Sequence, residues 1–278
     1  MVTSSPFSRL LHRLDLQQLD RDLFIGDPGP GKQRLYGGTV AAQAVVAAVR
    51  TVAEGELHSL HSYFLRPGRY GVPIQYVVHR IRDGRSFTTR RVVAHQGGEA
   101  IFNLAASFVK EEDGYSFQEP APPAPPPVGL PRWQDASEEG HERWDREFPV
   151  DMLECPKSEG PPGQGPMRKV WIRPQGELPE DPGIHAAMVT FASDRGLLST
   201  VLDSMDVPRR DLLPASLDHT LWFHRPPRWD GWLLYTTTGH AAQAARALIF
   251  GTMHREDGTL VVSAAQEGLT RVRKQPPG

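Results

Sequence analysis

The sequence contains a single cysteine, Cys155, among 278 residues. One thiol cannot form an internal disulfide, and it excludes metal sites built from several cysteines. No run of 18 apolar residues is present, so no membrane span is predicted. Arg, His and Asp interrupt the apolar residues of the first 20 positions, unlike the continuous apolar core of a signal peptide. These absences predict a cytoplasmic protein.

The chain also carries little net charge. Its formal charge is −2, with 31 basic and 33 acidic residues. This balance gives no electrostatic basis for non-specific binding to nucleic acid, so none is expected as a partner. A polyanionic ligand would need a local basic patch.

A repeated segment is the most informative feature that is present. HSYFLRPGR at residues 61–69 reappears in altered form as LWFHRPPRW at residues 221–229. Pro67 and Pro226 are 159 positions apart, and the turn glycines Gly98 and Gly258 are 160 apart. An apolar, helix-like run precedes each copy, and β-rich stretches follow it. A duplicated unit of one helix and several strands is predicted.

A proline-rich tract separates the two copies. Proline is too dense around FQEPAPPAPPPVGLP for a helix or a central strand, and it favours an extended linker. The predicted organisation is a first unit at residues 14–110, a linker at 111–133 and a second unit at 134–273.

Each unit is predicted to hold one helix followed by an antiparallel meander. Helices are expected at residues 38–52 and 184–203. Strands are expected at 57–66, 73–82, 86–95 and 99–109 in the first unit, and at 167–173, 216–225, 231–238, 243–254 and 259–271 in the second. Asp-Gly pairs at residues 83–84 and 257–258 supply the positive φ angles of hairpin turns.

The first helix is unusual because almost no polar face remains between Val40 and Val49. A helix that is apolar all round must be enclosed, and its small side chains suit close wrapping by a curved sheet. This arrangement is the hotdog fold, and two units in one chain predict an α+β double hotdog.

Eight stretches then follow one another in a characteristic order: LYGGTVAAQA, LHSLHSYFLRPG, RDGRSFTTRRVVAHQ, VWIRPQGELPED, FASDRGLL, SLDHTLWFHRP, WLLYTTT and VSAAQEGLTR. In this order the chain resembles the type II acyl-CoA thioesterases, the double-hotdog family, from about residue 14 to 273. The resemblance implies hydrolysis of acyl-CoA to a free fatty acid and CoA, with no metal and no organic cofactor.

The resemblance also implies a set of catalytic residues. The family uses an aspartate, a hydroxyl residue two positions before a DH pair, and a glutamine before EG. These positions fall on Asp194, Ser216 and Gln266. Some relatives have threonine where this chain has Ser216, so the hydroxyl is kept and a methyl group is lost.

The chemistry of these three residues suits thioester hydrolysis. A carboxylate such as Asp194 can hold a water in line and accept its proton. The neutral groups of Ser216 and Gln266 can orient the same water. The oxyanion needs donors, and the backbone N–H groups of Gly37 and Gly38 at a helix N-terminus are candidates.

The repeat predicts one catalytic centre per chain. By the approximate offset, Gly38 corresponds to Asp194, and Ala106 corresponds to Gln266. The first unit therefore lacks both functional groups and is expected to form a wall of the acyl pocket or part of the CoA site.

Structural roles compete with these assignments. Asp194 after Ser193 could be an N-terminal helix cap, and Ser216 and Gln266 could be ordinary strand residues. His58 is a candidate substrate-site residue, but it lies three positions from His61 on a strand, so the two cannot share a metal. Asp218 and His219 point to opposite faces, which excludes a Ser-His-Asp relay from this pair.

Two other functions remain open. Hotdog folds also serve acyl-CoA dehydratases and hydratases, which would need a histidine or an acid where Gln266 stands. A non-catalytic acyl-CoA binding relative is the second alternative. Sheet-to-sheet pairing of double hotdogs further predicts a homo-oligomer, a dimer or larger.

Overall fold

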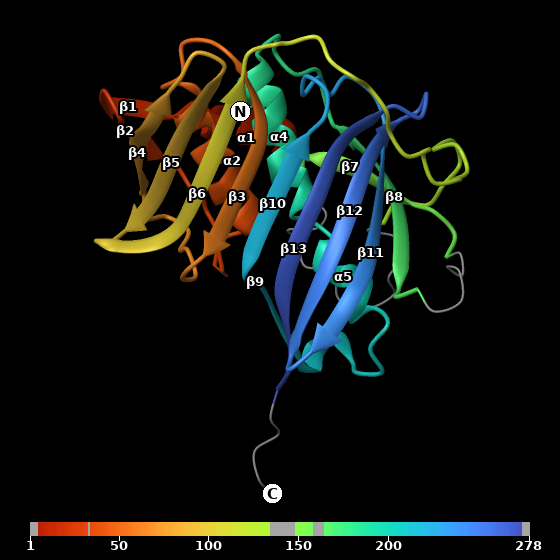
Figure 1. Ribbon diagram of the computed structural model, residues 1–278. Coiled ribbons are helices and arrows are strands. Elements are labelled where there is room, and N and C mark those ends of the chain that lie inside the picture. Colours follow the sequence, from red (N-terminus) through yellow and green to blue (C-terminus); the bar gives the residue numbers. More distant parts are fainter. Residues whose placement is uncertain (1–4, 33, 134–147, 158–163, 274–278) are drawn as a thin grey trace, which may run out of the picture.

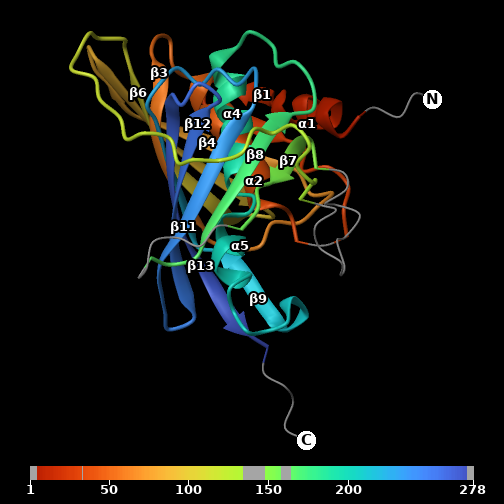
Figure 2. The same cartoon turned by 90° about the vertical axis from the view of Figure 1, so that its right-hand side faces the viewer.

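The computed structural model describes residues 5–32, 34–133, 148–157 and 164–273. One antiparallel sheet runs through this part of the chain in the order β1-β2-β4-β5-β6-β3-β10-β13-β12-β11-β8-β7, and β9 pairs with β13 (Figure 1). The helices lie on one side of the curved sheet (Figure 2). This is the α+β double hotdog that the sequence predicts.

The two units have matching strands. The first unit contains β1 (Gln17–Asp20), β2 (Leu23–Gly26), β3 (Glu56–Phe64), β4 (Ile74–Asp83), β5 (Phe87–Gln96) and β6 (Glu99–Val109). The second contains β7 (Val150–Glu154), β8 (Met167–Pro174), β9 (Leu212–Ser216), β10 (Asp218–Phe223), β11 (Leu233–Gln243), β12 (Arg246–Arg255) and β13 (Leu260–Val272).

The strand order corrects the predicted meander. Three strands of each unit are joined by hairpins, but β3 pairs with β6 rather than with β4, and β10 pairs with β13 rather than with β11. Strands β3 and β10, which precede the three hairpin-joined strands of their units, therefore lie at the centre of the whole sheet, where they join the units. The sequence gives no signal for the pairing partner of β3, because the connection at residues 65–73 is longer than a hairpin turn.

An approximate twofold axis passes between β3 and β10. Thr220 lies opposite His61, and Trp222 lies opposite Ser59 while Asp218 lies opposite Tyr63. Residues 159 positions apart are thus equivalent: Ser59 pairs with Trp222, and their equivalents Asp218 and Tyr63 pair with each other. An isologous dimer interface has the same reciprocal pairing. The repeated segment seen in the sequence marks these two strands.

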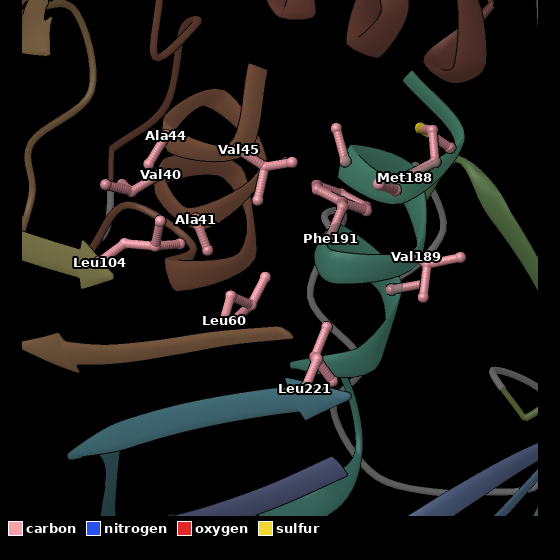
Figure 3. Packing of buried hydrophobic residues seen from close by; sticks show 14 of the residues in the cluster. Val40, Ala41, Ala44, Val45, Leu60, Leu104, Met188, Val189, Phe191 and Leu221 are labelled. Carbon is pink, nitrogen blue, oxygen red and sulfur yellow. The ribbon is translucent and has the colours of Figure 1, made fainter. Parts of the chain in front are cut away.

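The central helices are α2 (Gly37–Val49) and α4 (Pro182–Ser193). They lie side by side in the core, with Val45 and Phe191 between the two helices and with Leu60 and Leu221 between the helices and the sheet (Figure 3). A Cβ atom on Gly38 would meet the carbonyl oxygen of Phe191, and one on Gly183 would meet Val49. The helices are therefore antiparallel and touch closely at both ends.

The predicted helix at 184–203 is wrong in one respect, because it is two helices. Gly196 has a φ of 90° and ends the first helical run, and α5 (Leu197–Leu202) starts after it. This φ value is rarely adopted by residues other than glycine. The break leaves residues 194–196 as a short link between α4 and α5.

Several short elements carried no sequence signal. They are α1 (Pro6–Leu14), strands β1, β2 and β7, and a 3₁₀ turn at Arg209–Asp211. The predicted strand at 216–225 is also divided, because Leu217 separates β9 from β10.

The proline-rich linker lies against the outer face of the second unit (Figure 2). Residues 111–131 carry no helix or strand, as predicted. Trp171 Nε1 donates to the carbonyl of Pro125 at 2.8 Å, and Lys169 Nζ donates to that of Pro123 at 2.8 Å.

Residues 134–147, the start of the predicted second unit, lie outside the described residues. No helix in the described part of the chain is long and apolar enough to cross a membrane.

Candidate functional site

Asp194 lies at the break between α4 and α5. It is the C-cap residue of α4, with helical φ and ψ angles of −68° and −18°. The structural alternative of an N-terminal cap is therefore wrong, because Asp194 ends a helix, and the N-cap of α5 is Gly196. A carboxylate at a helix C-terminus is unfavourable for the helix dipole. Its stabilisation must come from other contacts.

Those contacts bring together residues from distant parts of the chain. Ser216 Oγ donates to Asp194 Oδ1 at 3.1 Å. The side-chain amide of Gln266 and the backbone N–H of Gly38 also lie close enough to the Asp194 carboxylate to lower its pKa. The three residues expected from the family resemblance therefore form one hydrogen-bonded cluster, and the N-terminus of α2 faces it.

The strands β9 and β13 set the positions of Ser216 and Gln266. Ser216 pairs with Gly268, two residues beyond Gln266, so both side chains reach the same side of the sheet. Gln266 Nε2 donates to Ser216 Oγ at 2.6 Å. Gln266 is only 1% exposed, whereas Asp194 and Ser216 keep partial exposure. Solvent and substrate can therefore reach the cluster from the side of Asp194.

His219 belongs to the same network, which the sequence analysis missed. Its Nδ1 lies 2.9 Å from Gln266 Oε1, and its Nε2 lies 2.7 Å from Ser193 Oγ. Asp218 does point away, as predicted, and accepts from the backbone N–H of Glu267 at 2.7 Å. The signal that could have found His219 is its position two residues before Leu221, because residues two apart on a strand share a face and Leu221 faces inward.

Burial dominates the electrostatics of the cluster. Desolvation raises the pKa of Asp194, while the neighbouring His219 and the hydrogen bonds from Ser216, Gly38 and Gln266 lower it. The pKa of His219 is lowered by desolvation and raised by the nearby Asp194. Asp194 is thus a stronger base than an exposed aspartate, and the imidazole favours its neutral form.

Two buried tyrosines hold the end of α4 in place. Tyr36 donates its hydroxyl to the carbonyl of Phe191 at 2.7 Å, and Tyr235 donates to that of Ser193 at 2.9 Å. These carbonyls belong to the last turn of α4, which has no intrahelical donors left. Desolvation, together with the charge of Asp194, raises the pKa of both tyrosines, so both remain protonated donors.

Gly37 and Gly38 lie where the two helices approach the cluster. A Cβ atom on Gly37 would lie 3.0 Å from Asp194 Oδ2 and closer still to the ring of Phe64. Larger residues would push the N-terminus of α2 away from the carboxylate. The structure therefore brings both glycines to the site.

His58 is not brought to this site. It lies near the start of β3, six residues before Phe64, or roughly 20 Å along an extended strand. Its Nε2 lies 2.8 Å from Ser107 Oγ, and its ring meets Phe87 edge to face. Its predicted place in the substrate site stays a prediction, at a hydrogen-bonded position away from the cluster.

The approximate twofold axis relates the cluster to a second, apolar position. Gly37 and Pro182, the first residues of α2 and α4, are 145 positions apart, whereas β3 and β10 are related by 159 and β6 and β13 by 160. The counterparts of Asp194, Ser216, Gln266 and His219 are Val49, Leu57, Ala106 and Leu60. The predicted match of Ala106 to Gln266 agrees with this register.

The predicted match of Gly38 to Asp194 is wrong. The segment that joins α4 to β9 is longer than the one that joins α2 to β3, so one offset cannot serve both helix and strands. Gly38 corresponds instead to Gly183, and it contacts Asp194 across the helix pair. The apolar position borders a cavity of about 200 Å³, lined in part by Val49, Leu57 and Gly183.

A cavity of about 1200 Å³ lies elsewhere, at the N-terminus of α4, where its lining includes His185 and Trp229. None of the cluster residues lines it. Acyl transfer needs a base and donors around one reacting atom, so we locate the site at the cluster rather than at this cavity. Among the described residues, no three His, Cys, Asp or Glu side chains lie together as a metal site.

Comparison with known proteins agrees with this architecture. Residues 145–269 match the family described as acyl-CoA thioesterase, and residues 26–109 match the acyl-CoA thioesterase N-terminal domain. The chain is 36% identical over 287 aligned positions to acyl-coenzyme A thioesterase 8 of Mus musculus, covering 94% of this chain and 88% of that protein. It is 32% identical to acyl-CoA thioesterase 2 of Haemophilus influenzae, covering 96% and 99%.

A solved structure is also similar. The acyl-CoA thioesterase II TesB2 from Mycobacterium marinum superposes with a TM-score of 0.84 at 38% identity, covering 96% of this chain and all of that one. Fold, coverage and identity agree, and the chain therefore belongs to the TesB-like acyl-CoA thioesterase family of double-hotdog enzymes.

Proposed function

We propose that this protein hydrolyses fatty acyl-CoA to a free fatty acid and CoA, with Asp194, Ser216 and Gln266 as catalytic residues. One observation carries the proposal. A partly exposed carboxylate, whose pKa is raised by burial, accepts a hydrogen bond from Ser216, which accepts one from Gln266, and the N-terminus of α2 faces the same carboxylate. Family membership supports acyl-CoA as the substrate.

The proposed reaction begins with a water held by Asp194, Ser216 and Gln266. Asp194 takes a proton from the water as its oxygen forms a bond to the thioester carbonyl carbon. The tetrahedral intermediate collapses, the carbon–sulfur bond breaks, and the CoA sulfur leaves with the electron pair. The proton on Asp194 then passes to the sulfur, which gives CoA and the free acid.

The N-terminus of α2 supplies electrostatic stabilisation in this scheme. Its backbone N–H at Gly38 faces Asp194, Gly37 lies beside the same carboxylate, and the helix dipole favours negative charge there. We propose that the carbonyl oxygen of the thioester lies near these groups in the transition state.

The dehydratase alternative would need a free histidine or acid beside the acyl chain. His219 is the histidine nearest to Gln266, but it is fully buried and both ring nitrogens are in hydrogen bonds. It has no nitrogen left to remove a substrate proton. A non-catalytic binding relative would not need the basic, donor-rich environment of Asp194.

Two wider predictions accompany this function. The exposed outer face of the central strands, with Tyr63 and Trp222, suits the sheet-to-sheet pairing that predicts a homodimer or larger oligomer. The cytoplasm remains the predicted compartment on the basis of the sequence. Light scattering of the purified protein tests the first prediction, and cell fractionation tests the second.

The test of the mechanism is thiol release from acyl-CoAs of short to long chain, measured for the native enzyme and for Asp194→Asn. The variant should lose about 10²- to 10⁴-fold in kcat, the contribution typical of a general base. Asp218→Asn is the matched control, because Asp218 is also partly buried with a pKa raised by desolvation but lies outside the cluster. It should keep the native rate.

Two results would contradict the proposal. The first is background thiol release from every acyl-CoA by the native enzyme. The second is an Asp194→Asn variant as active as the native enzyme.

A further inference from the structure

His219 is a buried polar residue in a position where the other unit has an apolar one. Its exposed fraction is 0%, and its counterpart on β3 is Leu60, also fully buried. Burying an imidazole in place of a leucine is unfavourable unless both nitrogens form hydrogen bonds. The histidine of the second unit therefore needs polar partners for both nitrogens, which the leucine of the first unit does not.

The partners of His219 define where its proton lies. Gln266 Oε1 can only accept a hydrogen bond, so His219 Nδ1, 2.9 Å away, carries the proton and donates. Ser193 Oγ lies 2.7 Å from Nε2 and 3.0 Å from the carbonyl oxygen of Thr190, so its single proton has two acceptors within reach. Burial lowers the pKa of His219, in keeping with a neutral ring protonated on Nδ1.

This proton position orients the Gln266 amide. With Oε1 accepting from His219, the amide nitrogen points to Ser216 at 2.6 Å and to Asp194. The opposite orientation would place Oε1 against the Asp194 carboxylate and the NH₂ group against the Nδ1–H donor. Both contacts would then be repulsive.

The hydrogen bonds thus form a chain with a single direction. His219 donates to Gln266, Gln266 to Ser216, and Ser216 to Asp194. Every donor points toward the carboxylate that is proposed to activate water. A chain of this kind preorganises the site, because no member can turn without breaking two bonds.

We propose that His219 is a positioning residue of the hydrolytic site, which holds the Gln266 amide with its NH₂ group toward Ser216, Asp194 and the attacking water. The inference rests on the proposed function. His219 does not touch the reacting atoms itself, and its effect passes through Gln266.

The test is a double-mutant cycle read by thiol release. His219→Leu introduces the residue of the other unit, and it should lower kcat about 10²-fold, the effect of a misplaced catalytic group, with little change in KM. In a Gln266→Ala background the same substitution should change kcat by less than about twofold, because its target is gone. His219→Asn keeps an amide donor near the position of Nδ1 and should restore most of the native kcat.

A structural role would give a different pattern. Equal fold losses in both backgrounds would overturn the proposal, as would a His219→Asn variant as slow as His219→Leu. Melting temperatures show whether each variant is folded, and if His219→Leu does not fold, His219→Asn with and without Gln266→Ala carries the test.

A second measurement does not depend on activity. Nitrogen-15 NMR of the imidazole groups, with His219→Asn used for assignment, should show His219 protonated on Nδ1. A ring protonated only on Nε2 would overturn the proposed orientation of Gln266. An inactive native enzyme with the expected protonation would count against the proposed function and leave the orientation standing.

Discussion

Asp194 shows how burial and hydrogen bonding compete at a single residue. Desolvation favours the neutral acid, whereas the neighbouring His219 and three donors favour the carboxylate, and desolvation is the larger effect. The result is an aspartate whose pKa lies above its ordinary value of 3.8. Its remaining exposure gives water a path to it.

The pH dependence of the enzyme should follow from this balance. The acidic limb of kcat/KM should lie above the pKa of an ordinary aspartate, because protonation of Asp194 removes the base. Ser216→Ala removes a donor that lowers this pKa, so the limb should move to higher pH. The measurement is kcat/KM against pH for both proteins.

His58→Gln serves as the control, since His58 lies at the far end of β3 and should leave the limb unchanged. Movement of the limb to lower pH in Ser216→Ala would contradict the assignment of Asp194 as the base.

At the scale of elements, the break between α4 and α5 determines where Asp194 points. Gly196 has a φ of 90°, which lets the chain turn two residues after Asp194 and start a new helix. A continuous helix over 184–203, as the apolar pattern predicts, would carry this carboxylate on a regular helical face instead. The glycine therefore has a functional as well as a structural effect.

Gly196→Ala should reduce both stability and activity. A side chain at this φ costs about 1 kcal/mol of the free energy of unfolding, and the link should shift to relieve the strain. Gly98→Ala is the matched control, because Gly98 has a φ of 84° in a hairpin turn with open space around it. Urea unfolding should show similar losses for both variants, and thiol release should fall only for Gly196→Ala. Equal activity of the two variants would count against a role for this break.

The linker is an element held by side-chain contacts rather than by secondary structure. It covers a small apolar cluster that contains Cys155 and Trp171, and burial raises the pKa of the Cys155 thiol to about 11. A buried thiol of this kind should react slowly with thiol reagents.

Trp171→Phe should loosen the linker, because it removes the hydrogen bond to Pro125 and leaves most of the apolar contact. The expected loss is about 1 kcal/mol, and labelling of Cys155 by a thiol reagent should become faster. Labelling of the native protein is the reference. Equal labelling rates would show that the linker does not protect the thiol.

At the scale of the whole molecule, the approximate twofold axis creates two equivalent positions, and only one of them carries polar residues. Val49, Leu57 and Ala106 stand where the other position has Asp194, Ser216 and Gln266. Loss of the polar residues in one unit removes the desolvation cost of a second buried carboxylate. The proposed mechanism then predicts one reacting site per chain.

A reciprocal pair of substitutions tests this asymmetry. Ala106→Gln should leave kcat unchanged, because no base lies near it, but it should lower the free energy of unfolding by about 1–3 kcal/mol through overpacking. Gln266→Ala should lower kcat sharply. Denaturant unfolding and thiol release measure the two effects, and a changed kcat in Ala106→Gln would argue against a single site.

The sequence by itself determined much of the fold. The apolar run between Val40 and Val49 required an enclosed helix, and the repeat at residues 61 and 221 identified two units. Both Asp-Gly pairs fall at turns between strands, although only Gly258, not Gly84, has the predicted positive φ. These are local properties, since backbone conformation at a turn and burial of a helix follow from the residues themselves. Ordered motifs likewise pointed to Asp194, Ser216 and Gln266.

The tertiary structure decided what depends on contacts between distant segments. The place of β3 beside β6 and β10, the contact of Gly38 with Asp194, and the position of His58 follow from how the sheet closes around the helices. His219 is the plainest case. On the strand it alternates away from Asp218, and its meaning appears only when Ser193 and Gln266 reach its two nitrogens from other elements, because a hydrogen bond needs both partners in place.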